Sequence, residues 1–103
     1  MAAPAQAQKE MYGLIGKLIA APGRRDDLIA ILKNGTADMP GCVAYVIARD
    51  AADENTIWIT EVWNTEADHD ASLSLPAVKD SIAKGRPLIA GGSRIAVTHP
   101  VAK

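Results

Sequence analysis

The pattern of apolar and polar positions changes its period inside one segment of the chain, residues 56–75. Up to residue 63 two sets of side chains alternate, and one of these sets is Ile57, Ile59, Glu61 and Trp63. A period of two is typical of a β-strand. Thr65 then supplies a hydroxyl that can cap a helix, and Asp68 follows three residues later. The segment therefore predicts a strand that leads directly into a helix.

Similar patterns predict the elements of the N-terminal half. Residues 11–19 and 42–49 are rich in apolar and β-branched side chains, which favours two strands. Residues 24–34 have the spacing of an amphipathic helix. That helix ends at Gly35 or continues as far as Met39.

Proline and glycine mark the boundaries in the C-terminal half. Pro76 is expected to restart or kink the second helix, because proline is tolerated in a first helical turn. Gly85 and Pro87 break the helical pattern. Residues 91–92, both glycine, predict a loop, and residues 94–98 predict the last strand.

The predicted order is β-α-β-β-α-β, an α+β fold of the ferredoxin-like type with a four-stranded antiparallel sheet and both helices on one face. The other face is apolar too, because Trp58 and Val62 alternate with the set that contains Ile57. An exposed apolar sheet is unusual on a monomer. We therefore predict a homodimer whose sheets stack face to face about a two-fold axis, with Trp58 in the interface.

Length and charge limit the functional classes. The 103 residues suit a single domain, which we place at residues 11–103, after a flexible Ala- and Gln-rich tail at 1–10. Eleven basic and twelve acidic residues, without a basic run, argue against binding to nucleic acid or to an anionic membrane surface. No apolar run is long enough for a membrane-spanning helix.

The N-terminal tail bears on the location of the protein. Its Ala-x-Ala spacing resembles the end of a secretory signal, but the cationic and apolar regions of such a signal are missing. We expect a cytoplasmic protein. The alternative is a periplasmic or secreted protein whose signal peptide had been removed.

The most promising chemistry lies at the strand-to-helix corner. Glu61 is a carboxylate on an apolar strand face, where burial is costly without a partner. Trp63 shares that face, and His69 lies one turn into the following helix. Metal and nucleophile motifs are missing: the two histidines lie far apart, and Cys42, the only cysteine, reads as a buried inert thiol. The sequence thus predicts no metal site.

A family resemblance rests on short motifs that follow one another over residues 11–97. They are Pro22-Gly23, Pro40-Gly41-Cys42, Tyr45, Glu61-Val62-Trp63, Asp70-Ala71-Ser72-Leu73 and Pro87-Leu88-Ile89-Ala90-Gly91. With these motifs and the predicted topology, the chain resembles the antibiotic biosynthesis monooxygenase family. These are small, cofactor-free quinol monooxygenases of the dimeric α+β barrel superfamily.

The chain also departs from that family. Many relatives have histidines where this chain has Ser72 and Ala77, whereas its own histidine in this region is His69. The haem-degrading branch of the superfamily has an Asn on the first strand and a His on the second helix. Neither is found at the corresponding position here, so haem breakdown is not expected.

The resemblance implies that O2 oxidises a quinol or polyhydroxylated aromatic without metal or flavin, in a homodimer. His69 is the candidate base, because imidazole exchanges its proton near neutral pH. Glu61 would orient the imidazole or bind a substrate hydroxyl, and Arg86 would stabilise the developing oxyanion. Candidate substrate-binding residues are Trp63 and Tyr45, as aromatic walls, and Ser72, on the same side of the helix as His69.

Each of these residues except Ser72 has a structural alternative. His69 would then be a surface or structural residue, and Glu61 a partner of a backbone amide or of Arg86. Trp63 and Tyr45 would be packing residues, and Arg86 a solvated charge at a helix end. For the whole protein, the alternative is a non-catalytic dimeric barrel that binds a small apolar ligand or has a stress or regulatory role.

Overall fold

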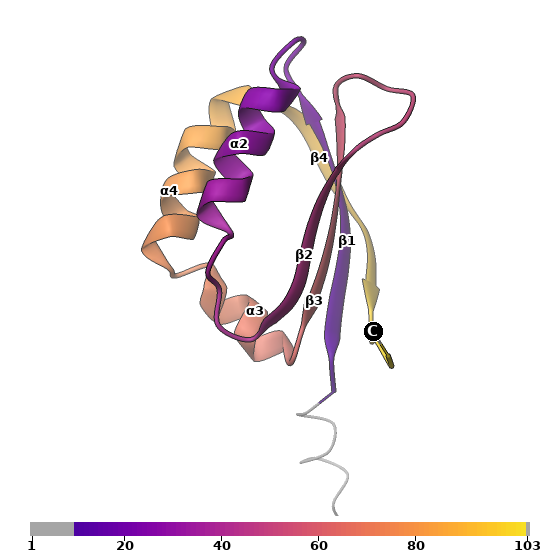
Figure 1. Cartoon of the computed structure of the whole chain (residues 1–103), viewed down its shortest axis with the longest axis vertical. Coiled ribbons are helices and arrows are strands. Elements are labelled where there is room, and N and C mark those ends of the chain that lie inside the picture. The colour runs from indigo at the N-terminus through magenta and orange to yellow at the C-terminus, as the bar shows by residue number, and fades with distance from the viewer. Residues whose placement is uncertain (1–9, 103) are drawn as a thin grey trace, which may run out of the picture.

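The computed structural model describes residues 10–102, so most of the predicted flexible tail at 1–10 lies outside the described residues. The described chain forms a four-stranded sheet with three α-helices on one face (Figure 1). In chain order the elements are β1 (Tyr12–Ala20), α2 (Arg25–Gly35), β2 (Cys42–Arg49), β3 (Thr56–Trp63), α3 (Glu66–Ser72), α4 (Pro76–Gly85), the 3₁₀ turn η1 (Arg86–Leu88) and β4 (Ile89–Thr98).

The sheet has the strand order β2-β3-β1-β4, and all neighbouring strands are antiparallel. This confirms the predicted ferredoxin-like α+β fold. The predicted bounds of β2 are confirmed, and α2 ends at Gly35 without continuing to Met39. None of the helices formed by the described residues is long and apolar enough to cross a bilayer.

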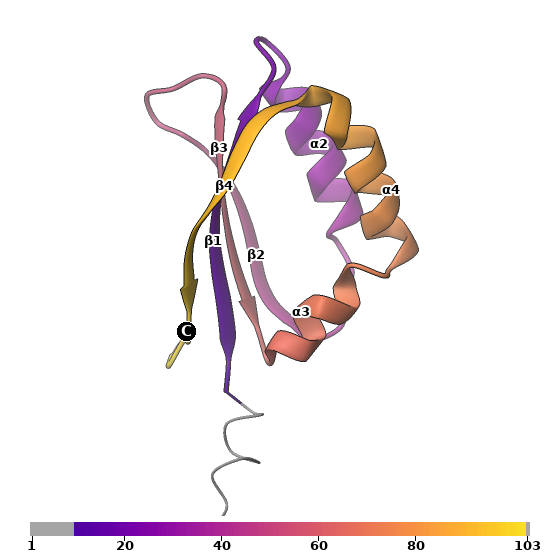
Figure 2. The same ribbon diagram turned by 180° about the vertical axis from the view of Figure 1, so that it is seen from behind.

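The predicted second helix consists of two helices. Thr65 caps α3, because its hydroxyl accepts a hydrogen bond from the amide of Asp68 at 3.1 Å. Pro76 is the first residue of α4, so it restarts the helix as predicted. The break between α3 and α4 lets α3 lie across the end of the helix layer while α4 runs beside α2 (Figure 2).

The predicted loop at Gly91 and Gly92 is wrong, because both residues belong to β4. They pair with Ile19 and Leu18 of β1. A methyl group at residue 92 would lie 3.0 Å from the Leu18 Cδ2 atom, so glycine leaves room for that side chain. Pairing with β1 has overridden the low strand propensity of glycine here.

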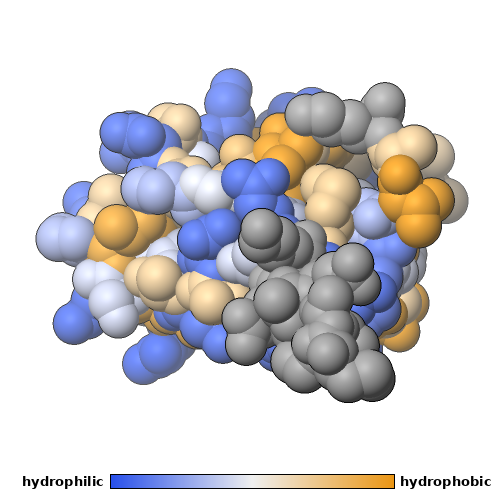
Figure 3. Space-filling model, turned by 90° about the horizontal axis from the view of Figure 1, so that it is seen from below, coloured by the Kyte–Doolittle hydropathy of each residue, from blue (hydrophilic) through white to orange (hydrophobic). Residues whose placement is uncertain are grey.

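The core lies between the sheet and the helices and has two clusters. One contains Tyr12, Leu14, Met39, Trp63 and Val78, and the other contains Ala20, Leu28, Ile57, Ile59 and Leu88. The sheet face that meets the helices is therefore the one that carries Ile57 and Trp63, as the alternation predicts. At the end of the molecule that carries α3, hydrophilic and hydrophobic side chains are interspersed among the visible described residues (Figure 3).

The opposite face of the sheet has no helix over it (Figures 1 and 2). Val46, which pairs with Thr60 of β3, lies on this outer face and is 53% exposed. Trp58 lies there too, and its indole nitrogen donates a hydrogen bond to Asp50 at 2.7 Å. Backbone amides, that of Asp53 foremost, and the Trp58 indole lower the pKa of Asp50 to about 2, so this carboxylate remains a charged acceptor.

Candidate functional site

Glu61 lies near the C-terminal end of β3, on the helix-facing side of the sheet. The strand register places it between Leu14 of β1 and Tyr45 of β2. One carboxylate oxygen, Oε1, accepts a hydrogen bond from the Trp63 indole nitrogen at 3.0 Å. Trp63 is only 1% exposed, so it acts as a buried anchor for the carboxylate. Among residues 10–102, Glu61 forms no ion pair, with Arg86 or any other cation.

His69 points from α3 into the protein. It is 9% exposed, and its ring packs against Tyr12 at a centroid distance of 5.3 Å and edge-on against Trp63 at 5.6 Å. The helix-surface alternative for His69 is therefore wrong. An imidazole among aromatic rings and a carboxylate is a reasonable candidate for proton transfer.

Asp70 determines which nitrogen of His69 carries the proton. His69 Nδ1 lies 3.1 Å from Asp70 Oδ1. An ionised carboxylate can only accept, so Nδ1 donates and the Nε2 of the neutral ring keeps its lone pair. The Asp70 side chain is 66% exposed, so the contact orients the ring with only a modest gain in stability. Sequence analysis missed this partner, because consecutive residues on a helix do not normally face each other.

The reactive atoms of Glu61 and His69 remain accessible. Within the described residues, no buried side-chain nitrogen or oxygen lacks a hydrogen-bond partner. Neither His69 Nε2 nor the second oxygen of Glu61 has such a partner, so both atoms must be in contact with open space. Glu61 and His69 line the same open hollow of about 420 Å³, which we call the polar chamber.

The polar chamber also receives Arg94, from β4. Arg94 pairs with Gly16, which follows Leu14 by two residues on the helix-facing side of β1. Gly16 leaves the floor open, since a methyl group there would meet only the Ser93 carbonyl oxygen, at 3.9 Å. Arg94 forms no ion pair among the described residues, so its guanidinium is available to an anionic group.

Arg86 is separate from this group. It is exposed and lines a second cavity of about 450 Å³, which we call the apolar chamber, together with Tyr45. Ser72 also has another role. Its hydroxyl donates a hydrogen bond to the His69 carbonyl oxygen at 2.6 Å, and its side chain is buried. Of the six residues predicted for the site, the structure thus brings His69 and Glu61 into one chamber, with Trp63 behind them.

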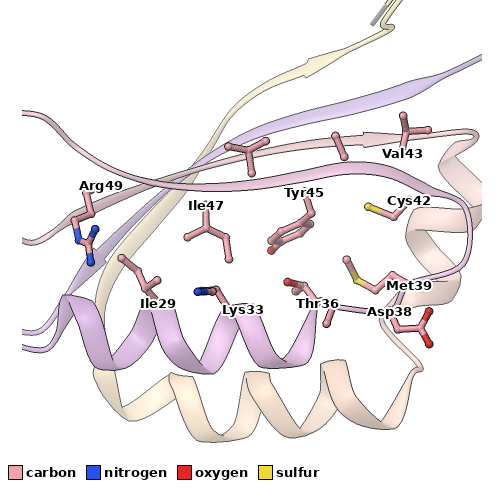
Figure 4. Close-up of a pocket in the computed structure, with 13 residues that line it drawn as sticks. Ile29, Lys33, Thr36, Asp38, Met39, Cys42, Val43, Tyr45, Ile47 and Arg49 are labelled. Atoms are coloured by element: carbon pink, nitrogen blue, oxygen red, sulfur yellow. The ribbon is translucent and has the colours of Figure 1, made fainter.

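A wider groove of about 900 Å³ runs between β2 and α2, where Figure 4 shows Tyr45 and Lys33 on facing elements. It contains neither His69 nor Glu61, so we place the candidate site in the smaller polar chamber. Cys42 lines this groove, and burial, followed by the charge of Glu61, raises the pKa of its thiol. A protonated thiol is a poor nucleophile, in agreement with the predicted inert role.

No group of three or more His, Cys, Asp or Glu side chains within residues 10–102 is arranged to hold a metal ion. The candidate site therefore consists of a carboxylate, an imidazole and a guanidinium around a small cavity. Such a set can take a proton from a substrate and hold the anion that results.

Comparison with known proteins assigns the family. The family model of the antibiotic biosynthesis monooxygenases matches residues 11–84, so the chain belongs to this family. A solved structure from Chloroflexus aurantiacus J-10-fl, provisionally described as an antibiotic biosynthesis monooxygenase, is 56% identical. The match covers 90% of this chain and 95% of that one, with a TM-score of 0.84.

More distant structures share the fold. A protein from Caulobacter crescentus CB15 with the same provisional description is 17% identical, covers 99% of this chain and 100% of its own, and has a TM-score of 0.82. A protein from Pseudomonas aeruginosa is 19% identical, with coverage of 92% and 98% and a TM-score of 0.80. Comparison with curated proteins found no match.

The environment of Tyr45 predicts a loss of stability at alkaline pH. Burial, then the charges of Glu61 and Cys42, raises the pKa of Tyr45 above its ordinary value of 10.0. Above about pH 10 the Tyr45 hydroxyl therefore loses its proton in the unfolded chain but keeps it in the folded protein. The free energy of unfolding then falls by up to about 1.4 kcal/mol per pH unit. Denaturant titrations over this pH range should show a smaller fall in Tyr45→Phe, whereas Tyr12→Phe should retain it. Equal falls in Tyr45→Phe and the wild type would contradict this account.

Proposed function

We propose that the protein is a cofactor-independent monooxygenase that oxidises a quinol or polyhydroxylated aromatic with O2. The observation that carries the proposal is that His69 and Glu61 line one chamber, and that His69 Nε2 and the second oxygen of Glu61 are both accessible. An electron-rich phenol needs only three things for this chemistry: a base, a partner for its oxyanion and a site with little water.

His69 is the general base in this proposal. Its Nε2 accepts a phenolic proton while the Nδ1–H continues to donate to Asp70. The phenolate then transfers an electron to O2, and the two radicals combine at a ring carbon. Overall, a quinol and O2 become a hydroxyquinone and water. The substrate supplies all the electrons, so no cofactor is required.

Glu61 and Arg94 position the substrate. The free oxygen of Glu61 can accept a hydrogen bond from a second hydroxyl group, while Trp63 holds the other oxygen in place. Arg94 lies at the same chamber and can stabilise the phenolate. We therefore assign the oxyanion-stabilising role to Arg94 in preference to the sequence candidate Arg86, which lines the other chamber.

We also propose that two copies pair through their outer sheet faces, as expected from the alternation. Val46 is 53% exposed on this face and Ile19 is 38% exposed. Trp58 already has a hydrogen-bond partner for its indole nitrogen, so a second copy can cover the ring without leaving that nitrogen unpaired. The Lys17 Nζ atom lies over the same ring, 5.7 Å from its centroid.

The first test is O2 uptake by metal- and flavin-free protein with a panel of quinols. His69→Ala should lower the rate by about 100-fold or more, because general-base catalysis contributes at least that much. His99→Ala is the matched control, since His99 lies at the exposed end of the sheet and should be dispensable. Unchanged turnover in His69→Ala would refute the proposed mechanism. If no quinol supports O2 uptake, the non-catalytic alternative is favoured.

The two arginines make a second test. Arg94→Gln should reduce kcat/KM for O2-dependent turnover by about 100-fold, as expected for removal of one oxyanion-stabilising donor. Arg86→Gln should have a smaller effect, because Arg86 lies away from Glu61 and His69. A larger loss in Arg86→Gln than in Arg94→Gln would reverse the assignment.

The oligomeric state can be measured by light scattering after size exclusion. The wild-type protein should have the mass of a dimer, and Val46→Glu should shift it towards the monomer, because a buried unpaired charge is costly. Leu73→Glu is the control, since Leu73 is similarly exposed, at 50%, but lies in the helix layer. A monomeric wild type at micromolar concentration would contradict the stacked-sheet dimer.

A further inference from the structure

The polar and apolar chambers adjoin. Both lie on the helix-facing side of the sheet, and both are lined by Leu18 of β1 and Ile59 of β3. These two strands are paired neighbours, and Leu18 pairs with Ile57, two residues before Ile59. The pair Leu18 and Ile59 therefore forms the boundary between the two chambers.

The two chambers differ in chemistry. The polar chamber contains Glu61, His69 and Arg94. The walls of the apolar chamber are largely aliphatic, formed by Leu28, Leu32, Ile82 and Ile89. Its Ser81 hydroxyl is already used, because it donates to the Ile31 carbonyl oxygen of α2 at 3.2 Å.

The apolar chamber is open at one end. Two of its large aliphatic side chains, Ile82 of α4 and Ile89 of β4, are 43% and 38% exposed. Protein interiors are otherwise close-packed, and a hollow with aliphatic walls offers water few hydrogen-bond partners. The space is therefore suited to an apolar group that enters between α4 and β4.

We propose that one substrate occupies both chambers. Its hydroxylated ring lies in the polar chamber, and an apolar extension, a fused ring or an alkyl chain, passes Leu18 and Ile59 into the apolar chamber. Leu18, Ile59 and Ile82 then determine which extensions are accepted. The inference rests on the proposed function, because His69 and Glu61 define where the ring lies. The chambers, of about 420 and 450 Å³, together remain within the roughly 300–1,000 Å³ typical of ligand sites.

The test measures binding without O2, so that the quinol is not consumed. Calorimetry under anaerobic conditions compares methyl-, butyl- and octylhydroquinone, with naphthohydroquinone as a fused-ring probe. Affinity should increase about fourfold for each methylene that enters the apolar chamber, until the chamber is filled. A gain in either the alkyl or the fused-ring arm supports the inference, whereas equal affinities for all four probes overturn it.

Variants locate the extension. Ile82→Trp should remove the higher affinity of octylhydroquinone and leave methylhydroquinone binding unchanged. Ile82 lines the apolar chamber but not the polar chamber. Leu73→Trp is the matched control, since Leu73 is exposed and lines neither chamber. Ile89→Trp fills the apolar chamber from β4 and should have the same effect if Ile82→Trp does not fold, because Ile89 does not line the polar chamber. A loss that is equal for methyl- and octylhydroquinone overturns the inference.

Oxygen uptake separates this inference from the proposed function. Affinity that depends on chain length, without O2 uptake, supports the two-chamber site and refutes the monooxygenase. Oxygen uptake with equal affinities for all four probes supports the monooxygenase and overturns the two-chamber site.

Discussion

The hydrogen bond from the Trp63 indole nitrogen to Glu61 keeps a charged group on the apolar, helix-facing side of the sheet. Without that partner the carboxylate would be costly to bury. Because Trp63 belongs to the core, the carboxylate is held in place, and its charge contributes to the raised pKa of Tyr45. The same indole also packs edge-on against His69. One tryptophan thus contacts both the carboxylate and the imidazole of the candidate site.

The break in the helix layer creates the room for this site. Pro76 separates α3 from α4, so that α3 brings His69 to the polar chamber while α4 contributes Ile82 to the apolar chamber. On the sheet side of the polar chamber, Gly16 leaves space that a side chain would otherwise occupy. Pro76 in the helix layer and Gly16 in the sheet therefore both help to leave a hollow between the sheet and the helices. This hollow is polar at one end and apolar at the other.

The two tryptophans of β3 serve opposite faces of the sheet in a similar way. Trp63 points towards the helices and donates to Glu61, whereas Trp58 points outward and donates to Asp50. In both cases a carboxylate satisfies the indole nitrogen, so the ring can be covered by apolar neighbours. For Trp63 those neighbours are the core. For Trp58 we propose that they belong to a second copy of the chain.

The alternation of side chains along β3 determined that strand, its helix-facing row and the shared face of Glu61 and Trp63, because a period of two records which side of a sheet is buried. The position of Arg94 at the polar chamber was decided by tertiary structure alone. Val97 pairs with Leu14 on the helix-facing side, so strict alternation would turn Arg94 away. A register shift between Ile15 and Gly16 reverses this, and Arg94 faces the chamber. Local patterns specify the faces of an element, but register shifts depend on strand pairing between residues distant in the chain.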